Sequence, residues 1–233
     1  MNAKGWKVLL VTSTIPSEGK STIAWNLAVT LAESNQKVLL IDTDLREPSL
    51  AKIVGAKVGN TGLYEAVMDP GKAEQAVQKL ETSDVYFIGL PQRVKSPVKF
   101  LSSPEFAEFI RQQKEKWDYI ILDTPPCQGL ADASVIADQS DAILYVIRQD
   151  TAKRWQIMDG IQNVGGHGIS ILGGVLNGIE SRLSGYGYNY YGKYGYGRYG
   201  YRRYGYGRYG YGYGKQSRER LVDSDSGEKT DEK

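Results

Sequence analysis

Six short apolar runs, rich in β-branched residues, alternate with longer amphipathic stretches between residues 6 and 180. The runs cover 7–13, 37–42, 85–90, 119–123, 142–148 and 169–177. Such alternation is typical of βαβ units, which build a parallel sheet, and the unbroken apolarity of the runs predicts strands that are buried on both faces. The sequence therefore predicts an α/β fold with a doubly wound, mostly parallel sheet, helices on both faces and ligands beyond the carboxyl ends of the strands.

The stretches between the runs predict the helices. These are expected over 20–34, 61–68, 104–116, 132–138 and 151–164. In the first of them Ile23, Leu27 and Leu31 recur at i, i+4 and i+8, with Ala24 and Ala28 beside them. This spacing predicts one apolar stripe that faces the sheet.

Cysteine and histidine are too scarce for two common kinds of site. The chain has one of each, Cys127 and His167, which excludes a disulfide framework and a Cys/His zinc site. We expect Cys127 to be a packed thiol. No stretch approaches the roughly 18 to 20 apolar residues of a membrane span, and the N-terminus lacks a signal-peptide cleavage pattern. We therefore expect a cytoplasmic protein.

Tyrosine and glycine are concentrated near the C-terminus. Residues 185–214 comprise 13 Tyr, 11 Gly, four Arg, one Lys and one Asn, and carry a net charge of +5, whereas residues 1–184 carry −2. A Tyr-Gly segment offers no aliphatic core, so we expect it to be disordered. The predicted organisation is a folded domain over 1–181, a tyrosine-rich tail over 182–214 and a charged, disordered C-terminus over 215–233.

The first predicted strand runs through TSTIPSEGKST directly into the first predicted helix. In this setting backbone N–H groups and the helix dipole bind phosphates, Lys20 reaches the β and γ oxygens, and the Ser21 hydroxyl coordinates Mg²⁺. Thr14 stands where the general pattern G-x-x-x-x-G-K-[ST] has glycine, so the loop is a variant. An ordinary helix start at Gly19 stays as the alternative. The predicted nucleotide-binding residues of the loop are Ser13, Thr14, Ile15, Pro16, Ser17, Glu18, Gly19, Lys20, Ser21 and Thr22.

Carboxylates end two of the other predicted strands. Asp42 and Asp44 lie in IDTDLREP, and Asp123 ends YIILD. Carboxylates gathered at one sheet edge are costly without a cation and suit a site for ATP with Mg²⁺. We predict that Asp44 and Asp123 hold the metal with Ser21, and that Asp42 accepts the proton of the incoming nucleophile. The exchange of these roles between Asp42 and Asp44, and a helix-capping role for Asp44, stay open.

Two further polar residues lie near this edge. Asn177 follows the last predicted strand, where its amide could bind the adenine base or cap a turn before Gly178. Arg46 could stabilise phosphate charge, bridge subunits or be solvated. The residues alone do not choose among these roles.

Together these motifs resemble those of the bacterial tyrosine kinases that act in capsular and exopolysaccharide synthesis. The family's loop, S-x-x-P-x-x-G-K-[ST], is met over 13–21, its D-x-D-x-R motif over 42–46 and its Walker B motif by IILDTPP. The C-terminal tyrosine cluster completes the pattern, and the resemblance extends over about residues 5–214.

The resemblance implies a kinase that uses ATP and Mg²⁺ to phosphorylate its own tyrosine cluster, usually in a neighbouring molecule. It also implies a membrane adaptor that activates the kinase and recruits it to the inner face of the membrane, and a phosphotyrosine phosphatase that resets it. Family members usually have an E-x-x-R-x-x-R helix for ring assembly before the first strand, whereas this chain begins almost at that strand, so a homo-oligomer stays open. The implied phosphoacceptors are Tyr186, Tyr188, Tyr190, Tyr191, Tyr194, Tyr196, Tyr199, Tyr201, Tyr204, Tyr206, Tyr209, Tyr211 and Tyr213.

Two alternatives compete with this interpretation. A partitioning-type or septum-positioning ATPase shares the variant loop, but has a signature lysine where this chain has Ile15. In the second alternative the tail binds nucleic acid or forms condensates by aromatic stacking and arginine charge. Five positive charges in 30 residues are sparse for tracking phosphates, and the folded part is net acidic, so nucleic acid is not an expected partner.

Overall fold

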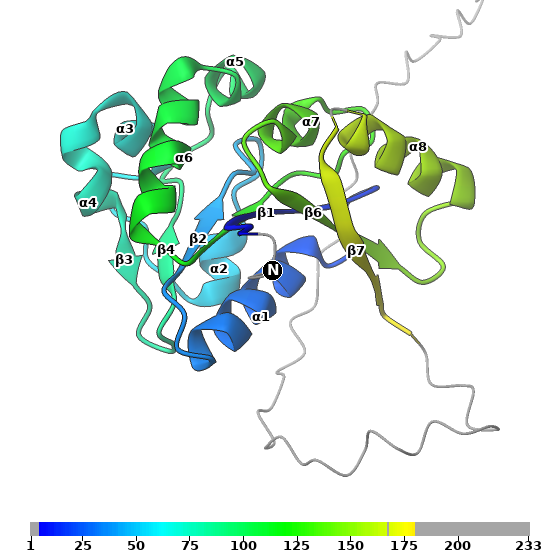
Figure 1. Cartoon of the computed structure of the whole chain (residues 1–233), viewed down its shortest axis with the longest axis horizontal. Coiled ribbons are helices and arrows are strands. Elements are labelled where there is room, and N and C mark those ends of the chain that lie inside the picture. The colour runs from blue at the N-terminus through cyan, green and yellow to red at the C-terminus, as the bar shows by residue number, and fades with distance from the viewer. Residues whose placement is uncertain (1–4, 167, 180–233) are drawn as a thin grey trace, which may run out of the picture. The chain divides into compact units, whose positions relative to one another are not determined.

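A computed structural model describes residues 5–166 and 168–179 of the chain (Figure 1). The predicted tyrosine tail, its phosphoacceptors and the charged C-terminus lie outside the described residues. Within the described ranges, no helix is long and apolar enough to cross a membrane.

Within residues 5–166 and 168–179, the core is one seven-stranded sheet with the strand order β3-β4-β2-β5-β1-β6-β7. All neighbouring pairs are parallel except β3 and β4. The six predicted strands and the predicted fold class are confirmed, while the two-residue strand β3 was not predicted. The strands are β1 (Val8–Ser13), β2 (Val38–Asp42), β3 (Gln78–Lys79), β4 (Tyr86–Ile88), β5 (Tyr119–Asp123), β6 (Ala142–Arg148) and β7 (Ser170–Asn177).

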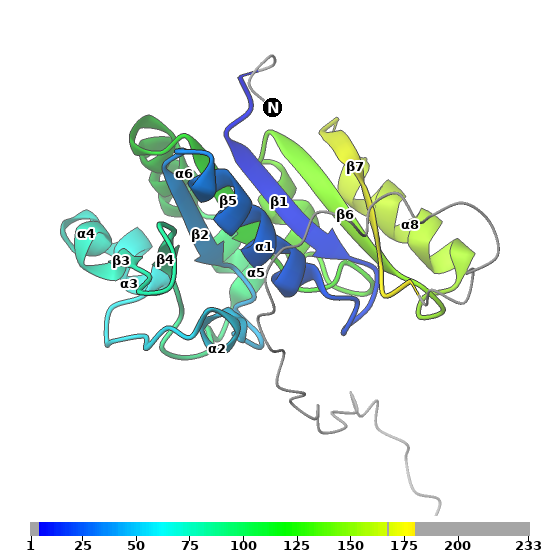
Figure 2. The same cartoon turned by 90° about the horizontal axis from the view of Figure 1, so that it is seen from below.

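Helices cover both faces of the sheet. Figure 1 shows α1 and α2 on one side of the strands and α5 to α8 on the other, and in Figure 2 α1 lies in front of the sheet. Each face has its own apolar core. The predicted helices correspond to α1 (Lys20–Glu33), α3 (Leu63–Met68), α6 (Pro104–Lys116), α7 (Asp132–Ala137) and α8 (Arg154–Gly165). The short α2 (Leu50–Val54), η2 (Pro70–Lys72), α4 (Ala73–Ala76) and α5 (Pro97–Leu101) were not predicted.

The face of α1 that packs on the sheet is centred on its alanines. Its buried residues are Ser21 and the alanines Ala24, Ala28 and Ala32, whereas Ile23, Leu27 and Leu31 are only partly buried at its flank. Small side chains at the contact bring the helix backbone close to the strands, and Ile23, Leu27 and Leu31 fill the space along one side of the alanines. The predicted stripe therefore does pack on the sheet, with the alanines rather than the larger residues at its centre.

Burial on both faces holds for the central strands and fails at the edge. Every residue of β1, β2 and β5 is buried, but every position of β7 is exposed or half-buried. In the described part of the chain β7 pairs with β6 alone, so its outer side is an open edge. An edge strand can be as apolar as a central one, which is why its sequence predicted burial.

The parallel register brings the functional strand ends together. Asp42 of β2 lies opposite Asp123 of β5, and β1, which leads into the loop 14–19, is the other neighbour of β5. The predicted convergence at the carboxyl edge of the sheet thus follows from strand order and register.

Candidate nucleotide and phosphoryl-transfer site

The loop between β1 and α1 makes a sharp turn before the helix begins. Ser17 and Gly19 have positive φ angles of 69° and 94°. Gly19 is the N-cap of α1, and a Cβ there would occupy the position of the Asn177 amide. A side chain at position 19 would thus be strained and would clash. Since the first N–H groups of a helix have no acceptor within it, the start of α1 provides donors for an anion.

The variant residue Thr14 is anchored beneath the loop. Its Oγ1 lies 3.0 Å from the Tyr145 hydroxyl, which lies 3.3 Å from the Cys127 sulfur. All three residues are buried, and burial raises the pKa of the Cys127 thiol. Cys127 is therefore the packed thiol that was predicted, and Thr14 provides a side-chain contact that glycine could not make.

Lys20 and Ser21, the first two residues of α1, meet the carboxylates at the sheet edge. The Lys20 ammonium lies 3.8 Å from Asp44 Oδ2 and donates to Ser21 Oγ at 3.2 Å. The Lys20 and Asp44 side chains are only 13% and 9% exposed, so this pair is weakly screened by solvent. The ammonium is thus positioned among the groups that were predicted to handle phosphate.

Asp42 is buried and accepts two backbone hydrogen bonds. Its Oδ1 accepts from the N–H of Asp44 at 3.1 Å, and its Oδ2 from the N–H of Leu50 at 3.0 Å. Burial, together with the nearby charge of Asp123, raises the pKa of Asp42 to about 8. A carboxylate with this pKa is a stronger proton acceptor than an ordinary one.

Asp44 shapes the turn that follows β2. Its Oδ1 accepts from the N–H of Glu47 at 3.0 Å, and burial raises its pKa although the Lys20 charge opposes the shift. The next helix, α2, begins at Leu50 with Ser49 as its N-cap, so Asp44 does not cap it. The capping alternative for Asp44 was wrong.

Asp123 is the most isolated of the three carboxylates. It is buried, and within the described residues neither of its oxygens has a hydrogen-bond partner. Burial raises its pKa against the opposing effects of the Lys20 ammonium and the Ser21 hydroxyl. An unpartnered buried carboxylate beside a hydroxyl fits a hard divalent cation.

A metal here would need ligands beyond the protein carboxylates. Among residues 5–166 and 168–179, no group of three or more His, Cys, Asp or Glu could hold a metal ion by itself. Mg²⁺ in nucleotide sites is typically held by one or two protein oxygens, with phosphate oxygens and water completing the shell. The donor set at Ser21 and Asp123 fits that mode.

Asn177 and Arg46 both make contacts within the chain. The Asn177 amide donates to the Glu18 carbonyl at 2.9 Å, and its oxygen accepts from the Gly178 N–H, as the turn-capping alternative predicted. Arg46 forms a two-pronged pair with Asp132, with Nε 3.1 Å from Oδ1 and Nη2 3.0 Å from Oδ2. Arg46 therefore braces the turn after β2 against α7, and its solvated alternative was wrong. Nothing in the sequence around Asp132 indicated this role.

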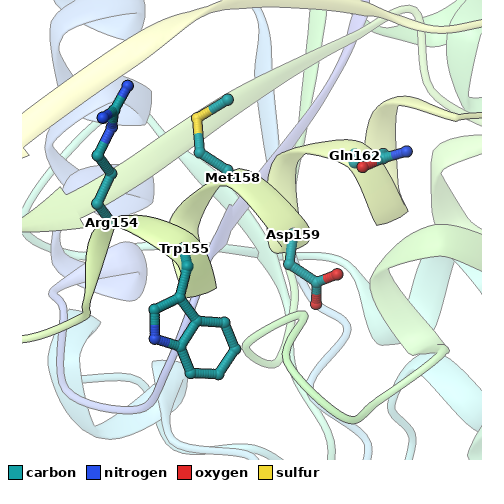
Figure 3. A pocket seen from close by; sticks show the side chains of 5 residues that line it. All are labelled: Arg154, Trp155, Met158, Asp159 and Gln162. Carbon is teal, nitrogen blue, oxygen red and sulfur yellow. The ribbon is translucent and has the colours of Figure 1, made fainter.

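A hollow on the surface of α8 is separate from these groups. It is lined by residues of this one helix, and Figure 3 shows their side chains. Trp155 and Met158 are 62% and 56% exposed. None of the predicted nucleotide-site residues lines the hollow. The lining residues are Arg154, Trp155, Met158, Asp159 and Gln162.

The parallel sheet, the phosphate-binding loop after β1 and the carboxylates at the ends of β2 and β5 define a P-loop protein that uses ATP. The family model of the AAA domain matches residues 7–164. The tyrosine-protein kinase YwqD of Bacillus subtilis is 32% identical over 183 residues, which are 78% of this chain and 77% of that protein. The chain belongs to the bacterial tyrosine kinase family and is a protein-tyrosine kinase.

Solved structures agree with this assignment. The kinase domain of the Escherichia coli tyrosine kinase ETK superimposes with a TM-score of 0.72 at 27% identity, covering 80% of this chain and 73% of that one. The septum site-determining protein MinD of Pyrococcus horikoshii gives 0.63 at 25% identity, covering 73% of this chain and 69% of that one. The alternative of a septum-positioning ATPase thus shares the fold, whereas YwqD, a relative by sequence, is a tyrosine-protein kinase.

Proposed function

We propose that this kinase transfers the γ-phosphoryl group of ATP to tyrosines 186–213 of a neighbouring copy of the chain, and so regulates the synthesis and export of a capsular or exopolysaccharide. The observation that carries the proposal is the convergence of Lys20, Asp42, Asp44 and Asp123 at the end of a phosphate-binding loop, in a chain that also carries 13 clustered tyrosines. The loose transition state of phosphoryl transfer mainly requires positioning and charge stabilisation, which such a site provides.

Each residue has a role in the proposal. The N–H groups of the loop and of the start of α1 bind the phosphates, and Lys20 contacts the β and γ oxygens. Ser21, Asp44 and Asp123 would hold Mg²⁺, which neutralises developing phosphate charge when bound. Asn177 is proposed to contact the adenine base.

Asp42 is proposed to accept the hydrogen bond, and then the proton, of the tyrosine hydroxyl. When it is ionised, a carboxylate with a pKa of about 8 is a stronger base than an ordinary one, because its pKa is closer to that of a phenol, about 10. Its oxygens each accept one backbone N–H, and a carboxylate oxygen can accept a second hydrogen bond. Asp42 can therefore hold the turn after β2 through these N–H groups and also accept the proton of the tyrosine.

Phosphorylation would act on the charge of the tail. Each phosphate adds about −1.5 to −2 at pH 7, so about three of them would cancel the +5 of residues 185–214 and further ones would reverse its sign. The proposal includes release of an assembly or partner by this change, activation by a membrane adaptor that recruits the cytoplasmic kinase, and reset by a phosphotyrosine phosphatase.

Mixing two variants tests the transfer between molecules. A chain that ends at Ser184 keeps the site but lacks acceptors, and full-length Lys20→Met keeps the acceptors but lacks the phosphate-binding ammonium. After incubation with MgATP, with and without the cytoplasmic segment of a candidate adaptor, we expect phosphotyrosine within 186–213 of the Lys20→Met chain. ATP hydrolysis without any phosphotyrosine would instead favour a switch ATPase, the function that the likeness to MinD suggests.

The roles of the two neighbouring carboxylates are separable in the same assay. Asp42→Asn is expected to slow transfer while Mg²⁺-ADP binding persists, whereas Asp44→Asn is expected to weaken the Mg²⁺ dependence of nucleotide binding. The opposite pattern would exchange the two roles.

A further inference from the structure

A buried glutamate stands in the middle of the phosphate-binding loop. Glu18 directly precedes Gly19 and Lys20, and its side chain is fully buried although the residues around it form the anion site. A carboxylate facing the phosphates would repel them, so its direction in the loop decides its effect.

The Glu18 carboxylate binds the loop itself and the neighbouring strand. Its Oε2 accepts from the N–H of Ile15 at 2.7 Å, which closes the loop across three residues. Its Oε1 accepts from the N–H of Arg148, the last residue of β6, at 3.3 Å. The Glu18 carboxylate is therefore directed into the protein, where it binds the backbone N–H groups of Ile15 and Arg148.

Two side chains from the ends of β6 and β7 complete the contacts. The Arg148 guanidinium donates to the carbonyl of Ser17 at 3.1 Å, and the Asn177 amide donates to the carbonyl of Glu18 at 2.9 Å. Ser17 has a positive φ of 69°, a conformation that costs a non-glycine residue free energy and persists only when its surroundings hold it. Arg148 provides such a contact directly at the strained residue.

We infer that Glu18, Arg148 and Asn177 form a clamp that holds the loop in its phosphate-binding shape before ATP arrives. Glu18 is its central positioning residue, because it ties Ile15 to Arg148 while its own carbonyl receives Asn177. The clamp binds the carbonyls of Ser17 and Glu18 and the N–H of Ile15. The N–H groups at the start of α1 therefore remain available to donate to phosphate. Such preorganisation lowers the ordering cost of binding.

Nucleotide affinity tests the clamp without any tyrosine phosphorylation. We expect Glu18→Ala to weaken binding of ADP with Mg²⁺, measured by calorimetry, by roughly tenfold or more, because two backbone bonds are lost. Glu18→Gln, which can replace one of the two accepting oxygens, should fall between Glu18→Ala and the wild type. Arg148→Met should weaken binding severalfold, since only the Ser17 contact is lost.

Asp141 offers a matched control, because it is also a carboxylate that accepts two backbone N–H groups. Its Oδ2 accepts the N–H groups of Lys7 and Val8, each at 2.8 Å, where β1 begins. Asp141→Asn is thus expected to lower the melting temperature and to leave ADP affinity unchanged when measured well below that temperature. Equal weakening by Asp141→Asn and Glu18→Ala would overturn the inference, as would wild-type affinity in Glu18→Ala. If Glu18→Ala does not fold, wild-type affinity in both Glu18→Gln and Arg148→Met would overturn it.

Because this readout is ADP binding, the clamp and the proposed tail phosphorylation can fail independently. A chain that binds ADP through the clamp but never labels its tyrosines would refute only the proposed function.

Discussion

Gly160 of α8 lies against the side chains of Tyr145 and Cys127, beneath the phosphate-binding loop. A Cβ at this position would overlap the Tyr145 hydroxyl and lie 2.8 Å from the Cys127 sulfur. The same hydroxyl contacts Thr14 of the loop at 3.0 Å. Gly160→Ala therefore forces Tyr145 to move and disturbs its contact with the loop.

The magnitude follows from two opposed effects. Alanine in a helix interior normally stabilises by up to about 1 kcal/mol relative to glycine. Overpacking a filled core costs about 1–3 kcal/mol, and a lost internal hydrogen bond adds about 1 kcal/mol. We expect Gly160→Ala to lower the free energy of unfolding by about 2 kcal/mol, which for a domain of this size lowers the melting temperature by about 4–8 °C.

Gly165 provides the control within the same helix. A Cβ there would lie 3.5 Å from Ile171 Cδ1, an ordinary contact, so Gly165→Ala should be neutral or stabilising by up to about 1 kcal/mol. Both variants are compared with the wild type by thermal and urea unfolding. The reasoning is refuted if Gly160→Ala is as stable as the wild type, or if the two substitutions shift the melting temperature equally.

Three further substitutions test other parts of the structure. Arg46→Met leaves the buried Asp132 without its partner and should lower the free energy of unfolding by about 2 kcal/mol. This is below the usual range for buried pairs because the Arg46 side chain is 39% exposed. A double-mutant cycle with Asp132→Asn that gives no coupling would contradict this. Because burial raises the folded pKa of Asp42 to about 8, the folded protein keeps a proton there that the unfolded chain loses above about pH 4. This group therefore lowers stability as pH rises from about 4 to 8, by up to ~1.4 kcal/mol per pH unit, and Asp42→Asn should remove that part of the slope in urea unfolding; an unchanged slope would be evidence against the raised pKa. Ser103 caps α6 by accepting from the N–H of Phe106 at 3.2 Å, so Ser103→Ala should cost about 1 kcal/mol, and no change in urea midpoint would refute the cap.

Local sequence predicted the groups that act through short-range geometry. The strand, loop and helix around Lys20 follow one another in the chain, and a glycine before a lysine at a helix start already specifies where the phosphate donors point. The meeting of Asp42 with Asp123 was also predictable, since parallel strands of a doubly wound sheet end at one edge.

The remaining features depend on partners far along the chain. Arg46 and Asp132 are 86 positions apart, and Glu18 and Arg148 are 130 apart, so neither contact leaves a periodic signal in the sequence. The exposure of β7 depends on its place at the sheet edge rather than on its composition. The stripe of α1 was predictable from its spacing, but its centre lies on the alanines because close packing on the sheet favours small residues.

The central claim is that this chain phosphorylates its own tyrosine cluster, and intact-mass analysis after incubation with MgATP tests it most directly. The wild type, Lys20→Met and a chain ending at Ser184 are compared, with and without a candidate adaptor segment. The account predicts mass increases in multiples of one phosphate that occur only in the full-length chain with Lys20. Absence of any increase in that chain, even with the adaptor and while ATP is hydrolysed, would contradict it.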